Sequence, residues 1–523
     1  MKKILLGIAA ILVLVLVGCG NQESGTNSKR TNQDGEKELI IASVREPDTL
    51  DVQSTTWVDD TNGHLFDKLF NFDFEGNLIP GLVEEYEISE DSKVGTFHLK
   101  EDAKFHSGEP VTAEATIQSL ERFLEISPVF DILGPVEDMT AVDEHTVQIT
   151  WTEPYAPFFP GATTAYMGVI DTSVLDDAGE GFEKNPVASG PLKHVETKRG
   201  ESITYEPFED YNWGAEGAPD FDKVTFRFIS DDDTRLLEFK NGTVHILANV
   251  PPQYLKELEE DSEVTLEKVL ENGNTYLGFN MKRPIFEDKR VRQAIAKGID
   301  RDPIIDHALD GMAQPAYSAL PKTVFGYSQA VEDMAAEKYA RDVEGAKQLL
   351  AEAGWDEINS DGIVMKDGQA FTIELWMTDE PVMQRIGQII QNQLKEIGID
   401  IKLVVQEDAA IRAQTPEGAH EMILWRYGWP DADILYSLFG EGMSTRMHYE
   451  PAELNDLLLE ARAEVDIDKR LALYEEAQGF LVEESPWVPL FVRESVTASR
   501  GLENFKKHPI QDTLIWPGME FGN

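Results

Sequence analysis

A strand–helix–strand pattern in the second half of the chain constrains its fold more than any other feature. Residues 371–377 (FTIELWM) and 399–405 (IDIKLVV) have the apolar and β-branched composition of strands. Between them, residues 382–398 (VMQRIGQIIQNQLKEIG) repeat apolar side chains at helical spacing and end at a glycine. A helix that joins two strands in this way forms a crossover, which implies that the strands pair in parallel. The sequence therefore predicts an α/β fold.

Strands and helices mix throughout the rest of the chain. Strands are expected where apolar and β-branched residues dominate or alternate, and helices where apolar residues recur three or four positions apart. The expected strands are residues 38–44, 94–100 and 145–151, and the expected helices are residues 112–125, 290–300 and 343–355. The sequence has no short-period repeat or heptad series, and 523 residues are enough for two to four domains.

The only cysteine of the chain, Cys19, follows an apolar segment at the N-terminus. Two lysines precede residues 4–17, which carry no charge and are too few for a spanning helix of about 18 or more residues. A basic start and a short apolar core are typical of an export signal. The sequence LVGC, which ends at Cys19, resembles the lipobox of bacterial lipoproteins. We therefore predict a signal peptide at residues 1–18 and a lipid on Cys19; the alternative is a short anchor helix with an incidental cysteine.

Residues 19–37 contain no large apolar side chain, so we expect a flexible tether there. A chain whose only thiol carries a lipid can form neither a disulfide nor a zinc site with cysteine ligands. The expected protein is an extracytoplasmic folded body, anchored through its lipid to the outer face of the bacterial cell membrane.

The net charge of −50 limits the possible partners. Nucleic-acid binding needs a basic surface, and so does adhesion to anionic lipids through a basic patch. Two interpretations of the charge remain open. It is either an adaptation of the surface to a salty or alkaline exterior, or a means of attracting cationic ligands.

Signatures of catalysis are absent from the sequence. There is no G-x-S-x-G elbow, no Gly-Lys dipeptide of a P-loop, no H-E-x-x-H zinc motif and no dinucleotide fingerprint after a strand. The ten histidines include no pair spaced four residues apart, so a histidine-rich metal site is not expected. We predict a binding protein rather than an enzyme, without a cofactor.

Two segments carry a resemblance to a known family. The first is residues 82–124, with the core FHLKEDAKFHSGEP; the second is YLGFN at 276–280, followed by VRQAIAKGIDR at 291–301. They are similar to characteristic segments of the family 5 extracellular solute-binding proteins, which serve ABC importers of peptides, nickel and related solutes. Further matches, in the same order as in the family members, extend from Leu39 to the C-terminus.

The resemblance implies a type II periplasmic-binding-protein fold, with two lobes, a hinge and a small inserted domain. The implied ligand site is the cleft between the lobes, and hinge closure would bury the ligand. The implied divisions are lobe I at residues 38–75, 185–275 and 496–523, the small domain at 76–184, and lobe II at 276–495.

The resemblance also implies the function. We expect the substrate-binding component of an ABC importer, a monomer that captures short peptides and delivers them to permease subunits in the membrane. The alternatives are a nickel or other metal chelate, or another small solute. A cell-surface hydrolase and a receptor that contacts a sensor are the rivals from other classes.

Family members line the cleft with a loop that corresponds here to residues 422–435 (MILWRYGWPDADIL). Its aromatic and charged residues suit the walls and anchors of a peptide site, although aromatic residues at a strand end could equally belong to the core. The candidates are Trp425, Arg426, Tyr427, Trp429, Asp431 and Asp433. Peptide-binding relatives often capture the ligand's α-ammonium with an aspartate, and Gly428 occupies that position here. Asp431 would then have to substitute, or the ligand lacks that amine.

Three candidates lie outside this segment. Trp57 belongs to the first cleft-facing loop, where an exposed tryptophan without a role is the alternative. Nickel-chelate relatives carry an arginine in the region that corresponds to residues 154–170, which here contains Tyr166 but no arginine. In the alignment with those relatives, Arg122 is one position from their second arginine. His448 is close to the position of their metal-contacting histidine. We predict no metal site, because the first arginine is missing.

Overall fold

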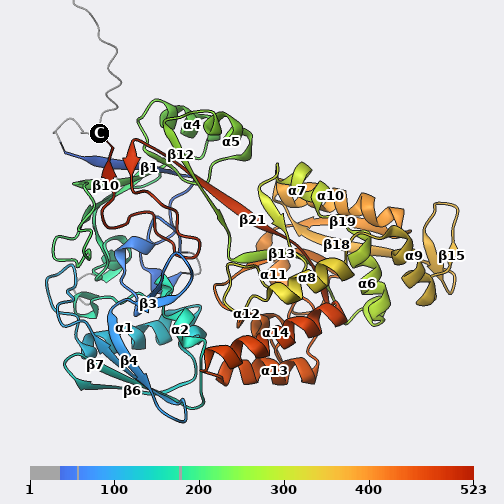
Figure 1. The fold of residues 1–523 in the computed structure, drawn as a ribbon, viewed down its shortest axis with the longest axis horizontal. Coiled ribbons are helices and arrows are strands. Elements are labelled where there is room, and N and C mark those ends of the chain that lie inside the picture. Colours follow the sequence, from blue (N-terminus) through green and yellow to red (C-terminus); the bar gives the residue numbers. More distant parts are fainter. Residues whose placement is uncertain (1–35, 56–57, 176–178, 523) are drawn as a thin grey trace, which may run out of the picture.

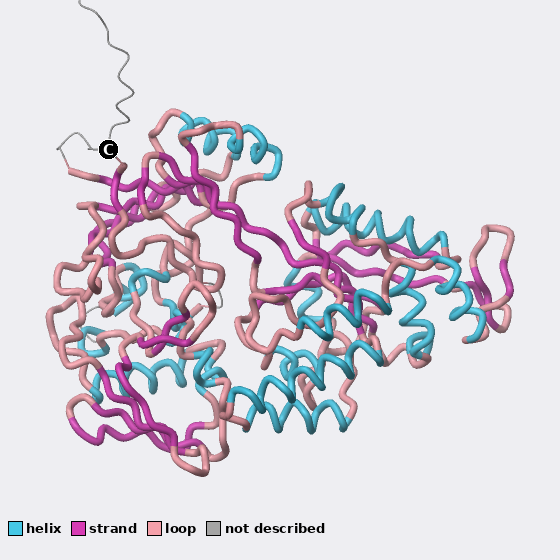
Figure 2. The backbone as a smooth tube through the Cα atoms, in the orientation of Figure 1, coloured by secondary structure: helices cyan, strands magenta, loops and turns pink. Residues whose placement is uncertain are grey.

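The computed structural model of this protein describes residues 36–55, 58–175 and 179–522. Two halves lie side by side and are joined by crossing strands (Figure 1). The left half contains residues 36–270 and 494–522, and the right half contains residues 273–493. Most helices belong to the right half, whereas strands and long loops dominate the left half (Figure 2).

The left half is built around β1 (Glu38–Ser43), the first strand expected from the sequence. On its two sides, β1 pairs in parallel with β10 (Lys223–Phe228) and β11 (Ile246–Leu247). β9 (Ser202–Pro207) and β8 (Leu192–Lys198) extend the sheet beyond β10 in antiparallel pairing. The helices α4 (Asp232–Lys240) and α5 (Pro252–Glu259) lie beside this sheet.

A separate antiparallel sheet forms the lower part of the left half. Its strand order is β4-β5-β7-β6. The bounds are β4 (Val83–Ile88), β5 (Val94–Leu99), β6 (Val136–Asp143) and β7 (Thr146–Trp151). The expected strands at 94–100 and 145–151 are confirmed as β5 and β7.

Helix α1 (Ala113–Ile126) covers this small sheet, where the sequence predicts a helix. The Thr112 side chain caps its first turn by accepting a hydrogen bond from the Ala115 amide at 3.2 Å. Leu120 and Phe123 are fully buried in the core that α1 shares with the sheet. We call this cluster of buried residues, which lie between Leu69 and Val169, the small-sheet core.

The predicted strand–helix–strand unit is confirmed in the right half. β18 (Thr372–Thr378) and β19 (Asp400–Gln406) pair in parallel along their full length, with Thr372 opposite Asp400. α10 (Pro381–Glu396) connects them. The sheet continues on the other side of β18 in the order β20, β13 and β21, and β14 also pairs β21. The further bounds are β13 (Gly273–Phe279), β14 (Ala313–Pro315), β20 (Met422–Gly428) and β21 (Trp487–Arg500).

Helices cover both faces of this sheet (Figure 1). One face carries α6 (Lys289–Gly298), α7 (Asp302–Ala308), α9 (Val343–Glu352) and α10, whose apolar residues form a core that we call core A. The other face carries α11 (Asp408–Gln414), α12 (Ile434–Phe439), α13 (Ala452–Ala463) and α14 (Ile467–Glu484), which form core B. The helices expected at residues 290–300 and 343–355 are α6 and α9.

β21 passes from one half to the other. Its first part, from Trp487 to Phe491, pairs β13, and its last part, from Glu494 to Arg500, pairs β12 (Val264–Leu270) of the left half. The chain also crosses in the reverse direction, directly from β12 to β13. The register of β13 against β21 shifts between Thr275 and Tyr276. Two adjacent strand connections therefore link the halves (Figure 1).

Short elements complete the described chain. They are β2 (Phe70–Phe72), β3 (Leu78–Pro80), α2 (Phe158–Gly161), α8 (Gln329–Lys338), β15 (Glu357–Ile358), β16 (Val364–Lys366), β17 (Gln369–Ala370), β22 (Leu502–Glu503), β23 (Glu520–Phe521) and the 3₁₀ turns η1 (Val52–Ser54), η2 (Gly63–Leu65), η3 (Phe130–Leu133), η4 (Ala165–Met167), η5 (Thr172–Val174), η6 (Gly179–Lys184) and η7 (Pro284–Phe286). Within the described ranges, no helix has the length and apolarity needed to cross a bilayer.

Candidate functional site

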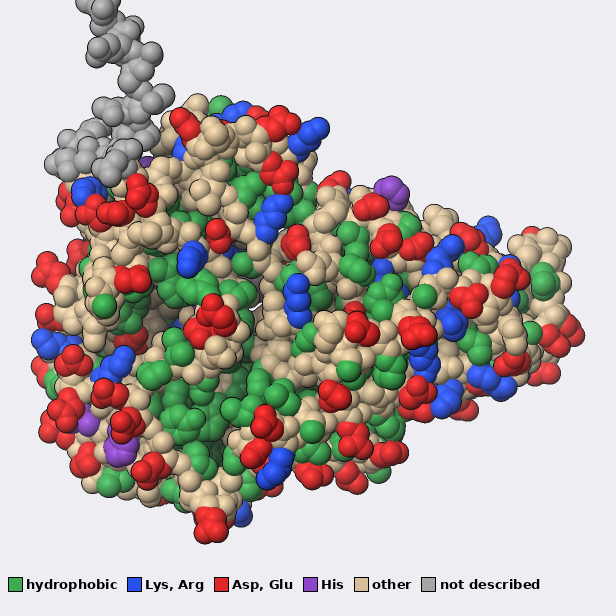
Figure 3. Space-filling model, viewed as in Figure 1, with side chains coloured by type: hydrophobic (Ala, Val, Ile, Leu, Met, Phe, Trp, Pro, Cys, Tyr) green, Lys and Arg blue, Asp and Glu red, His purple; other side chains and the backbone are tan. Residues whose placement is uncertain are grey.

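The surface is hollowed between the two halves, and hydrophobic side chains gather beside this hollow (Figure 3). β20 and the turn after it approach this region from the right half. Residues 422–435 are expected from the sequence to form a loop, and this expectation is wrong for most of the segment. Residues 422–428 form a strand that pairs with β13 on one side and β18 on the other, because its apolar residues fill both cores. Only residues 429–433 connect β20 to α12.

Trp425 is a core residue of the right half. Its side chain is 5% exposed and belongs to core B. The guanidinium groups of Arg412 and Arg446 lie 5.1 and 5.0 Å from its ring centroid, so two cations contact the indole. The structure therefore agrees with the alternative stated above for this segment, in which an aromatic residue at a strand end belongs to the core.

Tyr427 lies two residues further along the same face of β20. Its hydroxyl donates a hydrogen bond to the carbonyl oxygen of Ala319. Its ring stacks on Trp487 with a centroid distance of 6.0 Å and an interplanar angle of 17°. Burial raises the pKa of the hydroxyl well above its usual value. Tyr427 thus holds the turn at Ala319 against β20.

Trp429 makes an apolar contact with the other half. Its side chain is partly buried and packs against the small-sheet core of the left half. Its backbone amide donates to the carbonyl oxygen of Asn272, in the link between β12 and β13, at 3.0 Å. Trp429 therefore lies between the two halves, next to the crossing strands.

Asp431 is committed to a buried ion pair. It is 1% exposed, and its two carboxylate oxygens accept hydrogen bonds from Arg470 at 2.7 and 2.9 Å. The same arginine donates to the hydroxyl of Tyr474 at 3.2 Å. A ligand amine would have to displace Arg470 before it could bind this carboxylate.

Asp433 faces Arg462 at the boundary between the halves. Its Oδ1 lies 2.9 Å from Nε of Arg462, but neither atom has a hydrogen-bond partner in the described chain, so the contact is an ion pair with poor hydrogen-bond geometry. Burial raises the pKa of Asp433 to about 6, although the Arg462 charge acts in the opposite direction.

Arg462 also reaches the left half. Its guanidinium lies 5.2 Å from the ring centroid of Tyr155, and its carbonyl oxygen accepts a hydrogen bond from the Ala156 amide at 2.8 Å. The end of α13 and α2 are neighbours in Figure 1. Trp429 and the Asp433–Arg462 pair therefore both lie where the right half meets the left half.

Arg426 and Arg493 lie near the crossing strands. The Arg426 side chain is exposed, and nothing among the described residues forms an ion pair with it. Arg493 is partly buried, and its Nε and Nη2 atoms have no hydrogen-bond partner within those same residues. Sequence reasoning missed Arg493, because a single arginine in an apolar strand gives no local signal.

The remaining predicted residues are in the left half or outside the described chain. Arg122 pairs with Asp51 at 2.5 Å and donates to the Gln53 side chain at 2.7 Å, so it holds the segment after β1. Tyr166 lies in η4, partly buried, and burial raises its pKa. Trp57 and Cys19 lie outside the residues that the structure describes.

An acidic residue of the C-terminal segment, Asp512, lies near Tyr166. The charge of Asp512 contributes to the raised pKa of Tyr166, and the pKa of Asp512 is itself raised to about 7 by desolvation and by the nearby Asp60. Asp60 accepts hydrogen bonds from Lys507 at 2.7 and 2.8 Å. In Figure 1 the C-terminal segment runs over the upper and central part of the left half.

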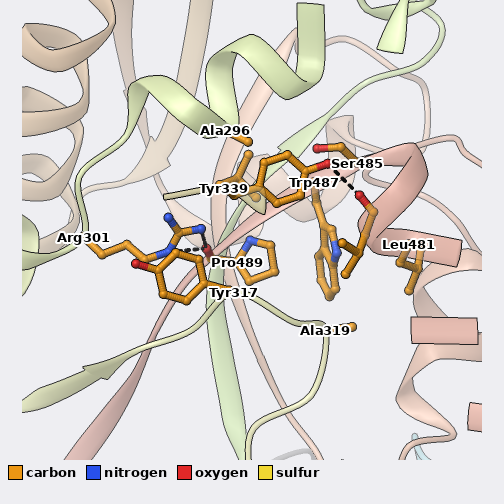
Figure 4. A pocket seen from close by; sticks show the side chains of 11 residues that line it. Ala296, Arg301, Tyr317, Ala319, Tyr339, Leu481, Ser485, Trp487 and Pro489 are labelled. Carbon is orange, nitrogen blue, oxygen red and sulfur yellow. Dashed lines mark hydrogen bonds between the residues drawn. The ribbon is translucent and has the colours of Figure 1, made fainter. Parts of the chain in front are cut away.

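An internal cavity of the right half is too small for a solute. Its volume is about 10 Å³, close to the space of a single water molecule. Figure 4 shows Arg301 and Trp487 among the residues that line it. The guanidinium of Arg301 lies 3.9 Å from the ring centroid of Tyr317 and donates to the carbonyl oxygen of Pro489 at 2.7 and 3.1 Å. This cavity belongs to the packing beneath β21.

His448 binds a backbone carbonyl rather than other metal-binding side chains. Its Nε2 lies 3.0 Å from the carbonyl oxygen of Thr415, and its ring centroid is 6.0 Å from that of His420. Within residues 36–55, 58–175 and 179–522, no three His, Cys, Asp or Glu side chains are grouped as metal ligands.

Comparison with known proteins places the chain in a family. The model of the bacterial extracellular solute-binding proteins, family 5 Middle, matches residues 77–444. The chain belongs to this family. Its members are solute-binding proteins and not enzymes. This agrees with the resemblance found in the sequence and with the absence of catalytic motifs.

Curated relatives match almost the whole chain. The oligopeptide-binding protein AppA of Bacillus subtilis is 28% identical over 97% of this chain and 96% of its own length. The dipeptide-binding protein of Escherichia coli is 27% identical over 86% of this chain and 88% of its own length.

Solved structures show the same fold. AgaA from A. tumefaciens R10, in complex with agropinic acid, is 30% identical with a TM-score of 0.72, over 90% of this chain and 95% of that chain. AppA from B. subtilis, in complex with a nonapeptide, is 25% identical with a TM-score of 0.73, over 93% and 99%. The expected type II periplasmic-binding-protein fold is confirmed.

Proposed function

We propose that this protein is the substrate-binding component of an ABC importer and that it captures short peptides between its two halves. The observation that carries the proposal is the match to the oligopeptide-binding protein AppA, of which the chain covers 96%. The crossing strands support it, because two strand connections between two bodies can serve as a hinge. Closure would bury the ligand, and the liganded form would dock on permease subunits in the membrane.

We assign the domains as the sequence implies. Lobe I comprises residues 38–75, 185–275 and 496–523, the small domain 76–184, and lobe II 276–495. The boundaries between the two lobes lie within a few residues of the crossings between the halves, where β12 ends at Leu270, β13 begins at Gly273, and β21 passes to β12 at Glu494.

The proposal includes a lipid on Cys19, a tether at residues 19–37 and a monomer held at the outer face of the cell membrane. A Cys19→Ser variant tests the anchor by metabolic labelling with a fatty acid. Poor processing and loss of the label are expected, and normal labelling of the variant would contradict the anchor.

A small solute other than a peptide is the second candidate. Asp431 is neutralised by Arg470 and Asp433 faces Arg462, so each of these two aspartates already has a cationic partner and is not free for a ligand amine. AgaA, with 30% identity, was solved with agropinic acid. A metal chelate remains a further alternative.

Thermal-shift screening separates these ligands. The screen contains di- to pentapeptides, nickel with and without histidine, and sugars. A peptide at about 100 times its Kd should stabilise the protein by roughly 2.7 kcal/mol, and mass spectrometry should show the peptide uncleaved. The peptide proposal is wrong if no peptide raises the melting temperature while nickel with histidine does.

A further inference from the structure

Arg426 and Arg493 project from the same face of the right-hand sheet. β20 and β21 both pair antiparallel with β13, so they flank it and run in the same direction. Leu424 and Phe491, which precede the two arginines by two positions, both pack into core A. Because side chains two positions apart lie on the same face of a strand, the arginines continue the face of core A beyond its end.

The two arginines lie at the edge of the sheet where a ligand of an α/β protein is expected. β18 and β20 are parallel, and their carboxyl ends point to the same edge. Arg426 is near the end of β20, three residues before Trp429, which contacts the other half. Arg493 is at the point where β21 leaves β13 and passes to β12.

Neither arginine has a carboxylate partner in the described chain. This is unexpected in a protein with 96 acidic and 46 basic residues. Burial lowers the pKa of Arg493, and the charge of Arg426 lowers it further. Glu271 and Glu380 act on Arg493 in the opposite direction, but neither forms an ion pair with it.

Such an arrangement is costly in the unliganded protein. A buried guanidinium with unsatisfied nitrogens loses hydration without gaining a hydrogen bond, and a second positive charge nearby adds repulsion. A carboxylate would remove both costs, since it accepts paired hydrogen bonds from the planar donors of arginine.

We propose that Arg426 and Arg493 bind a carboxylate of the ligand at the hinge end of the cleft. This inference rests on the proposed function, since it places the ligand between the two halves. It adds the ligand's chemical class: the solute carries an anionic group that enters next to β21. The carboxylate is either the C-terminus of a peptide or an acidic side chain.

Calorimetry with defined probes tests the proposal. The probes are Ala-Ala-Ala, its C-terminal amide and the C-terminal amide of Ala-Asp-Ala. We expect at least one carboxylate-bearing probe to bind 10-fold or more tightly than Ala-Ala-Ala amide, and the identity of that probe gives the source of the carboxylate. Arg426→Gln and Arg493→Gln should each abolish this preference. Arg199→Gln, which removes an exposed charge from the left half, is the matched control. Equal binding of all three probes, or a preference that survives both variants, would overturn the inference while leaving peptide binding intact.

A second measurement does not depend on peptide binding. In the absence of ligand, Arg493→Met should leave the melting temperature unchanged or raise it, because it removes an unsatisfied buried charge. An arginine kept for structure would instead lower the melting temperature on removal. Sodium propionate, compared with propionamide at equal ionic strength, should stabilise the original protein more than Arg493→Met. If no peptide binds, the proposed function fails. The melting temperature of Arg493→Met and the effect of propionate still decide whether Arg493 binds a carboxylate. A lower melting temperature for Arg493→Met, or equal effects of propionate on both proteins, contradicts it.

Discussion

The carboxylate of Asp431 and the guanidinium of Arg470 form a buried, two-point ion pair, with N···O distances of 2.7 and 2.9 Å. The two residues are 1% and 5% exposed. This pair fixes the turn after β20 to α14, and it makes Asp431 part of the scaffold that positions Trp429 and Asp433.

Removing one partner of this pair should destabilise the right half strongly. Asp431→Asn leaves Arg470 buried without a counter-charge, which costs about 3–5 kcal/mol of unfolding free energy. Urea unfolding followed by circular dichroism measures the change. Asp408→Asn, which removes an exposed ion pair with Arg412, should cost less than about 0.5 kcal/mol. An equal effect of the two variants would show that the buried pair contributes no more to stability than the exposed pair.

Binding offers a separate test of the same residue. At a temperature where Asp431→Asn is still folded, ligand affinity should stay within about 3-fold of the original, because Asp431 already has its partner. A loss of binding larger than 100-fold in folded Asp431→Asn would make this carboxylate a ligand contact after all.

Local periodicity made much of the fold predictable. The β18–α10–β19 unit, α1 and α6 each bury one face, so their apolar spacing marks them in the sequence. The pairing of Asp431 with Arg470 could not be predicted, because 39 residues separate the partners and nothing in the sequence distinguishes this arginine from the others.

The aromatic residues of β20 show the same limit. Trp425 and Trp429 occur in one short motif, yet one lies in core B and the other packs against the opposite half. Their fates depend on distant residues: Arg412 of α11 and Arg446 lie over the Trp425 ring, whereas Trp429 follows the end of β20 and packs against the small-sheet core. Sequence reasoning therefore found the segment, but it could not separate the scaffold residue from the residue at the boundary.

Asp433 should make the free energy of unfolding depend on pH between about pH 4 and 6. The folded-state pKa of about 6 is above the ordinary value of 3.8, so the folded protein binds this proton more tightly than the unfolded chain. Stability from this group is therefore present at low pH and is lost as pH rises through that window. Asp433→Asn removes the effect. The stability of the variant relative to the original should rise by up to roughly 3 kcal/mol from pH 4 to pH 7, measured by urea unfolding. A difference that is independent of pH would contradict the raised pKa.

Trp429 should stabilise the approach of the two halves. Trp429→Ala removes the apolar contact with the small-sheet core, so the unliganded protein should open and show a larger radius of gyration in small-angle X-ray scattering. Affinity for a peptide should fall roughly 10-fold, which corresponds to about 1.4 kcal/mol. Trp355→Ala is the control, because the Trp355 ring packs against Phe371 within the right half, with a centroid distance of 4.4 Å. It should lower stability without a change in radius, and the same expansion in both variants would rule out a specific role for Trp429.

Gly273 is required where β13 begins, next to the crossing from β12. A Cβ atom at this position would lie 1.9 Å from the carbonyl oxygen of Tyr427 and 2.8 Å from the Cα of Gly428, both backbone atoms that cannot move independently. Gly273→Ala must therefore separate β13 from β20, at a cost of about 1–3 kcal/mol or more. Gly479 in α14 is the matched control, since a methyl group added there would meet no atom within 4 Å, and Gly479→Ala should stabilise the helix by up to about 1 kcal/mol. Melting temperatures of the two variants should move in opposite directions. A Gly273→Ala protein as stable as the original would mean that β13 and β20 can separate without loss, and that this part of the hinge is more compliant than its packing indicates.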